Sequence, residues 1–130
     1  ALAPTSLTVG TGTNPRGTAA DLAAVDGRTF ALDSTTGVAP LVSWTATFTA
    51  VPATAPTLAA THTGSATLPC TRELSFLRWR DGAWLPAPSG TAATADVRSA
   101  TGEVRVRVRC TGSLRAFTAA TDALLLAPRR

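Results

Sequence analysis

The chain has 130 residues, which suits one domain with its own hydrophobic core, and a hydrophobic content of 45% argues against a disordered chain. No stretch approaches the ~18 apolar residues that a membrane-spanning helix requires, so we expect no membrane span. A formal net charge of +4 favours anionic partners mildly. Every basic residue is arginine, as in high-GC coding, which excludes lysine Schiff-base chemistry.

Short runs of alternating apolar and polar residues, separated by Gly, Pro and Asp turn signals, predict strands along the whole chain. Residues 10–17 are predicted as a loop, and residues 19–25 as a brief helical turn. No segment keeps a helical period over three turns, so we predict an all-β antiparallel sandwich, jelly-roll-like, with 8–9 strands in one domain spanning 1–130. The predicted strands are 6–9, 28–32, 41–51, 58–63, 72–79, 83–85, 92–97, 103–110 and 122–127.

Residues 41–51 form the clearest long strand. Its even-numbered positions place Trp44 and Phe48 on one apolar face, and its odd-numbered positions place Thr45 and Thr47 on the other. Trp44 is therefore predicted to lie in the core.

Residues 103–110 alternate most strictly. Val104, Val106, Val108 and Cys110 share the face predicted to be buried. The opposite face carries a row of three guanidiniums: Arg105, Arg107 and Arg109.

The two cysteines stand 40 positions apart in a chain rich in Thr, Gly and Pro. Because Cys110 points inward and Cys70 is its only intrachain partner, we predict a Cys70–Cys110 disulfide and an exported protein, secreted or at the cell surface. A pair of buried free thiols is the alternative. The start Ala-Leu-Ala-Pro, without Met, fits a processed export product or a fragment of a larger secreted protein.

Three segments each resemble part of a known kind of β-domain. Ala24-Val25-Asp26-Gly27 resembles an early A-x-DG turn. Trp79-Arg80-Asp81-Gly82-Ala83-Trp84 resembles a W-x-x-G-x-W hairpin of non-catalytic accessory domains in secreted bacterial hydrolases. Residues 102–110 with Leu124-Leu125-Leu126 are similar to the paired closing strands of such domains. Together, these segments resemble the galactose-binding-like jelly-roll modules, the family of discoidin and many carbohydrate-binding modules. The resemblance implies a ligand-binding or spacer module, sometimes with structural calcium, and transfers no binding residue.

Trp79 and Trp84 flank the predicted hairpin turn and could offer a sugar ring a stacking platform, assisted by Arg78 or Arg80. The alternative is that both indoles cap the end of the sandwich. The row Arg105, Arg107 and Arg109 is interpreted as a polyanion site, against the alternative of a solvated outer face. Specific nucleic-acid binding is not expected, since no basic helix accompanies the row.

Nothing in the sequence predicts catalysis. His62 is the only histidine and shares a strand face with Leu58 and Ala60, so a half-buried strand residue is expected rather than a general base. The eight acidic residues are scattered singly. No zinc spacing exists, and no cofactor is expected; if structural calcium binds, Asp21, Asp26 and Asp122 are the expected ligands.

The sequence therefore predicts a non-catalytic secreted binding module for carbohydrate or an anionic surface polymer. The alternative is a structural subunit, a spacer or a self-assembling surface domain, in which a long edge strand pairs with a neighbour.

Overall fold

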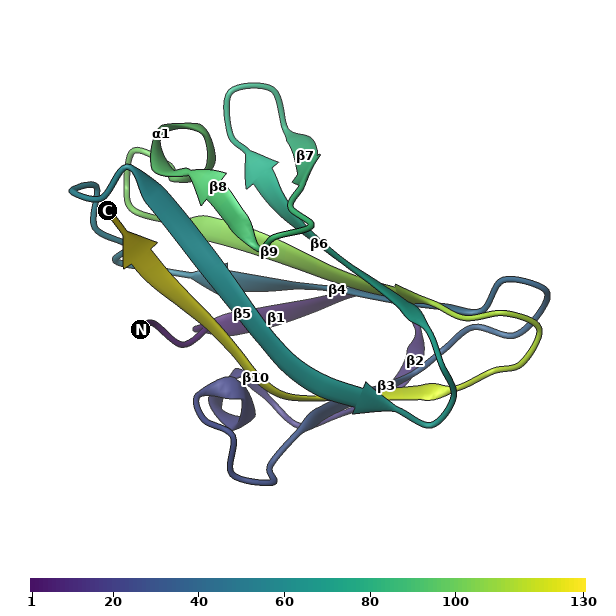
Figure 1. Cartoon of the computed structure of the whole chain (residues 1–130). Coiled ribbons are helices and arrows are strands. Elements are labelled where there is room, and N and C mark those ends of the chain that lie inside the picture. Colours follow the sequence, from purple (N-terminus) through teal and green to yellow (C-terminus); the bar gives the residue numbers. More distant parts are fainter.

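The computed structural model describes residues 1–130 as two five-stranded antiparallel sheets that face each other (Figure 1). We name each sheet after its middle strand. The order in the β9 sheet is β1 (Ser6–Thr11), β4 (Leu41–Phe48), β9 (Val104–Thr111), β6 (Thr71–Arg78) and β7 (Ala83–Pro86). The order in the β10 sheet is β2 (Thr13–Arg16), β3 (Phe30–Asp33), β10 (Thr118–Arg129), β5 (Thr57–Ala66) and β8 (Thr91–Ala93). The predicted all-β antiparallel sandwich is confirmed, with ten strands instead of eight or nine.

The core lies between the sheets and is organised around β9. Val104, Val106, Val108 and Cys110 are all buried, as the alternation predicts. In the register, Trp44 of β4 lies opposite Val108. Phe30 of β3 meets Trp44 edge to face, with ring centroids 5.2 Å apart, so an aromatic pair links the two sheets.

The predicted disulfide is confirmed. Cys110 lies near the end of β9 opposite Arg72, and Cys70 immediately precedes β6, so the Cα atoms of the two cysteines are only 5.5 Å apart. The bond therefore joins the start of β6 to the end of β9.

Two segments differ from the sequence prediction. Residues 10–17, predicted as a loop, contain β2, which pairs with β3 and is held by an Arg16–Asp33 ion pair at 3.0 Å. Residues 92–97, predicted as a strand, divide into β8 and one turn of helix, α1 (Thr94–Val97). The helical turn buries Thr94 and Val97, which are three positions apart, whereas a strand would direct them to opposite faces.

The predicted helical turn is the 3₁₀ turn η1 (Ala19–Leu22). The strand predicted at 41–51 ends at Phe48 because the chain turns at Ala50, which has a φ of 54°. The strand predicted at 122–127 extends from Thr118 to Arg129.

No edge strand is long. The edges are β1, β7, β2 and β8, with six, four, four and three residues, while every strand of eight or more residues is internal. Short edges limit strand pairing between molecules. The long edge strand on which the self-assembly alternative depends is therefore not part of this fold.

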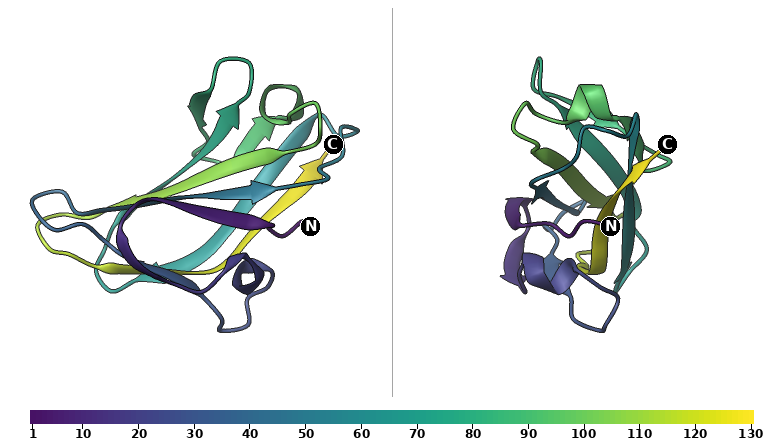
Figure 2. Two further views of the ribbon diagram at one scale, coloured as in Figure 1. Left: turned by 180° about the vertical axis from the view of Figure 1, so that it is seen from behind. Right: turned by 90° about the vertical axis from the view of Figure 1, so that its left-hand side faces the viewer.

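The two chain ends lie at the same end of the sandwich (Figures 1 and 2), where Leu2 and Leu126 form an isolated β-bridge. Neither η1 nor α1 is long and apolar enough to cross a membrane.

Removing the disulfide should destabilise the fold strongly. For a closed loop of 40 residues, the loop-entropy model predicts that a Cys70→Ala/Cys110→Ala variant loses about 4 kcal/mol of unfolding free energy. Urea denaturation followed by tryptophan fluorescence measures this difference. A loss below about 1 kcal/mol would show that the unfolded chain is not constrained by the bond in the way this model requires.

Candidate functional site

The outer face of β9 carries the predicted arginine row. Arg105 is exposed, whereas Arg107 and Arg109 are half-buried. Across the register, Arg107 lies between Thr45 of β4 and Ser75 of β6, and Arg109 lies between Ser43 and Glu73. Ser43 and Ser75 are buried although they belong to this outer face.

Two tryptophans from the β6–β7 hairpin join this row. The Arg105 guanidinium carbon lies 5.1 Å from the Trp79 ring centroid, and that of Arg107 lies 4.7 Å from the Trp84 centroid. Both indoles are half-buried, and the indole N–H of Trp79 donates a hydrogen bond of 2.9 Å to the carbonyl of Val97. The indoles therefore lie beside the outer face of the β9 sheet. We refer to Trp79, Trp84, Arg105, Arg107 and Arg109 as the Trp–Arg face.

Arg78 and Arg80, the other two arginines predicted to bind ligand, lie at the turn of the β6–β7 hairpin and not in the arginine row. Arg78 forms two hydrogen bonds with the Asp81 carboxylate, at 2.9 and 2.6 Å, and thereby holds the hairpin turn. The hydrogen bonds from Arg78 lower the pKa of Asp81 to about 2, and the same contact raises the pKa of Arg78. Arg80 is exposed in the turn.

The three arginines of the row are not electrostatically equivalent. Arg105 is paired with Glu103 at 2.9 Å, but neither Arg107 nor Arg109 has a carboxylate within 4.0 Å. The Nε of Arg107 is buried without a hydrogen-bond partner. Burial, and next the neighbouring Arg109, lower the pKa of Arg107, while Glu73 opposes this shift. An anion that binds here would meet two unpaired guanidiniums.

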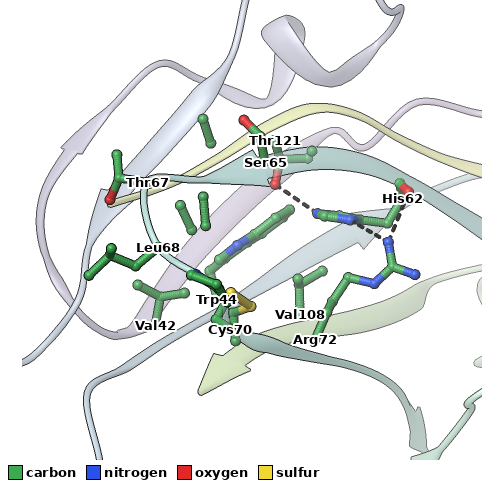
Figure 3. Close-up of a pocket in the computed structure, with 16 residues that line it drawn as sticks. Val42, Trp44, His62, Ser65, Thr67, Leu68, Cys70, Arg72, Val108 and Thr121 are labelled. Atoms are coloured by element: carbon green, nitrogen blue, oxygen red, sulfur yellow. Dashed lines mark hydrogen bonds between the residues drawn. A yellow bond between two sulfur atoms is a disulfide. The ribbon is translucent and has the colours of Figure 1, made fainter. Parts of the chain in front are cut away.

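The structure also shows a cleft that the sequence did not predict. It has a volume of about 590 Å³ and opens between the two sheets where β5 leads into β6 (Figure 3). Its walls include Trp44 and Val108 from the β9 sheet, His62 and Thr121 from the β10 sheet, and the disulfide. The rim includes Arg72 at the start of β6.

Hydrogen bonds fix the tautomer of His62 in this cleft. Nη1 of Arg72 lies 2.9 Å from His62 Nδ1 and 3.0 Å from the His62 carbonyl (Figure 3). Because a guanidinium only donates, Nδ1 is the acceptor, and the Nε2 proton is donated to Thr121 Oγ1 at 2.8 Å. Burial, and secondly Arg72, lower the pKa of His62 to about 4. His62 is thus the half-buried strand residue that was predicted, neutral at pH 7.

A β-bulge places Thr121 beside His62. Thr121 pairs with Gly64 and Ala123 pairs with Thr63, so Asp122 is the additional residue in β10. A Cβ on Gly64 would lie 2.6 Å from the carbonyl oxygen of Ala120. Glycine is therefore needed where β5 and β10 approach each other beside the cleft.

Two of the three acidic residues named for calcium, Asp21 and Asp26, hold local turns of the chain. Asp21 accepts a hydrogen bond from the backbone N–H of Thr18 at 2.8 Å, and Asp26 accepts one from that of Arg28 at 3.0 Å. Asp122 lies in the bulge with Oδ1 buried and unpartnered. No three His, Cys, Asp or Glu side chains group as metal ligands, so the three aspartates do not form one site. Structural calcium stays a prediction.

No protein-family model and no curated protein matches the chain. Among solved structures, the chain is similar to TmCBM61 in complex with β-1,4-galactotriose. The TM-score is 0.58, with 11% sequence identity over 96% of this chain and 90% of that chain. The chain has the β-sandwich fold of a carbohydrate-binding module. The resemblance predicted from the sequence is confirmed at the level of the fold.

The buried neutral His62 predicts how stability depends on pH. The unfolded chain binds a proton at His62 near pH 6.5 and the folded chain only near pH 4. Unfolding free energy should therefore fall as the pH drops from about 6.5 to about 4, by up to about 3 kcal/mol. Denaturation midpoints across this range measure the slope.

A His62→Gln variant provides the control because it keeps polar groups but does not titrate. Asp81 also stabilises the folded chain, because its pKa is lowered from 3.8 to about 2. This stabilisation is lost only below the pH range in which His62 titrates. An unchanged slope in His62→Gln would mean that another group is responsible.

Proposed function

We propose that the chain is a non-catalytic carbohydrate-binding module that holds polysaccharide on the Trp–Arg face. The observation that carries the proposal is the stacking of Trp84 on Arg107 at 4.7 Å beside the unpaired Arg109. The fold likeness to TmCBM61, which was solved with β-1,4-galactotriose, supports the same class of ligand.

The Trp–Arg face suits the two kinds of surface that a sugar presents. A pyranose ring has an apolar C–H face, which an indole covers well, and a hydroxyl edge, which hydrogen-bonding groups recognise. The guanidinium contacts of Arg105 and Arg107 with the two rings restrict the indoles before binding. Such preorganisation lowers the entropic cost of association.

The unpaired charges of Arg107 and Arg109 extend the proposal to acidic polymers. A carboxylate or sulfate on the polysaccharide would pair with the exposed part of the Arg107 guanidinium and reduce its repulsion with Arg109. We also propose export, because structural disulfides persist in oxidising compartments.

The chemistry of the titratable groups supports a non-catalytic role. His62 Nε2 donates to the Thr121 hydroxyl, whereas a general base would have to accept its proton. Asp33 and Asp81 both have a pKa lowered to about 2 by hydrogen-bonding partners. Glycoside hydrolysis needs a carboxylic acid with a raised pKa.

Substitutions on the Trp–Arg face test the proposal. Affinity electrophoresis through gels containing β-1,4-galactan, polygalacturonate or dextran should show retardation on at least one of the first two. Trp84→Ala should weaken that binding about tenfold, equivalent to about 1.4 kcal/mol, because the stacking surface is lost. Arg107→Ala should weaken polygalacturonate binding more than galactan binding.

Arg115→Ala is the matched control, since it removes an identical charge from the exposed β9–β10 connection. It should leave retardation unchanged. Equal losses for Arg115→Ala and Arg107→Ala would indicate a net-charge effect. The absence of retardation on all polymers at low ionic strength would refute carbohydrate binding by this chain.

A further inference from the structure

The cleft presents hydrogen-bond donors and positive charge. No Asp or Glu is among its lining residues. Several groups there have donor capacity that no partner within the chain uses, among them Trp44, Thr121 and Arg72.

Trp44 is the deepest of the three and is only 2% exposed. Of the three tryptophans, Trp79 alone donates its indole N–H to an acceptor within the chain. The Trp44 N–H thus stays unpaired in a side chain that is almost wholly buried and lines the cleft (Figure 3). The nitrogen of this N–H is not one of the fully enclosed, unpartnered side-chain atoms, so it is accessible from the cleft, and a ligand acceptor there can take the place of water.

Thr121 provides the second donor through the His62 tautomer. Arg72 donates to Nδ1 and His62 Nε2 donates to Thr121 Oγ1, so the hydroxyl oxygen is already an acceptor. The Thr121 proton then remains for another acceptor. Thr121 is 3% exposed and lines the cleft.

Arg72 supplies the charge at the rim. Both of its hydrogen bonds to His62 use Nη1, which leaves the Nη2 and Nε hydrogens without a partner in the chain. The remaining walls are largely apolar and include Val42, Leu68 and Val108.

From this geometry we propose that the cleft binds a small carboxylate-bearing molecule with a compact ring or apolar body. The carboxylate accepts hydrogen bonds from Arg72 and from Thr121 or Trp44, and the body contacts the apolar walls. A volume of about 590 Å³ lies within the usual range of small-molecule sites. The site is separate from the Trp–Arg face, because Val108 and Trp44 point to the inner side of the sheet whose outer side carries Arg107.

Two sources could supply this chemistry: a uronic acid at the end of a polysaccharide, or a free aromatic carboxylic acid. The probes are therefore D-galacturonate, its uncharged counterpart D-galactose, and benzoate. The readout is the indole N–H resonances of ¹⁵N-tryptophan-labelled full chain, which give one signal per tryptophan and are assigned with Trp79→Phe and Trp84→Phe variants.

The Trp44 resonance should move saturably and downfield with galacturonate, benzoate or both, while those of Trp79 and Trp84 move less. D-galactose should leave it in place. Arg72→Ala should weaken binding about tenfold or more, as expected for a lost charge-assisted contact. Arg72→Gln keeps a donor to His62 but loses the positive charge, so it should weaken carboxylate binding to a similar extent. Arg105→Ala, on the outer face of the sheet, should leave carboxylate binding unchanged.

Circular dichroism and thermal melts establish that each variant is folded. A Trp44 signal that ignores both carboxylates, or that responds equally to galactose, would overturn the proposal. The Trp44 signal reports on the cleft and gel retardation reports on the Trp–Arg face. A failure of one proposal can therefore be told apart from a failure of the other.

Discussion

The strict alternation of β9 is the constraint on which the rest of this structure depends. β9 lies in the middle of its sheet, so both neighbouring strands must match its register and its division into an inner and an outer face. Shifting the pairing by one residue would bury three guanidiniums and expose three valines. The core, the disulfide and the arginine row are therefore three consequences of one strand, and the row cannot move without losing the core.

The same strand separates two surfaces with different chemistry. Its outer side places Arg105 and Arg107 against the indoles of the β6–β7 hairpin, where the aromatic rings stay half-exposed. Its inner side contributes Val108 and Cys110 to the cleft. We propose a polymer ligand for the outer face and a small-molecule ligand for the cleft, which the disulfide lines. Glu103 neutralises Arg105, so the unpaired charge of the outer face is concentrated at Arg107 and Arg109.

Much of the fold followed from periodicity, because alternation in β4 and β9 is a strong local signal. Cys110 pointed inward and left Cys70 as its partner, so the disulfide could also be predicted. The contacts of Trp79 and Trp84 with the arginine row could not be predicted, because these contacts depend on the position of β7 beside β6. The cleft was not predicted because it requires the Asp122 bulge, which brings Thr121 beside His62, and a bulge leaves no clear trace in the polar and apolar pattern.

On our proposal, saccharide contacts the outer face of the β9 sheet. A residue-resolved map of amide and arginine Nε chemical shifts, recorded during titration with β-1,4-galactotriose and with an oligogalacturonate, tests this contact. If saccharide binds there, the shift changes should be concentrated at the Nε of Arg107, at Arg109 and along β6, β7 and β9. Changes confined to the β10 sheet or to the connections between strands would contradict it.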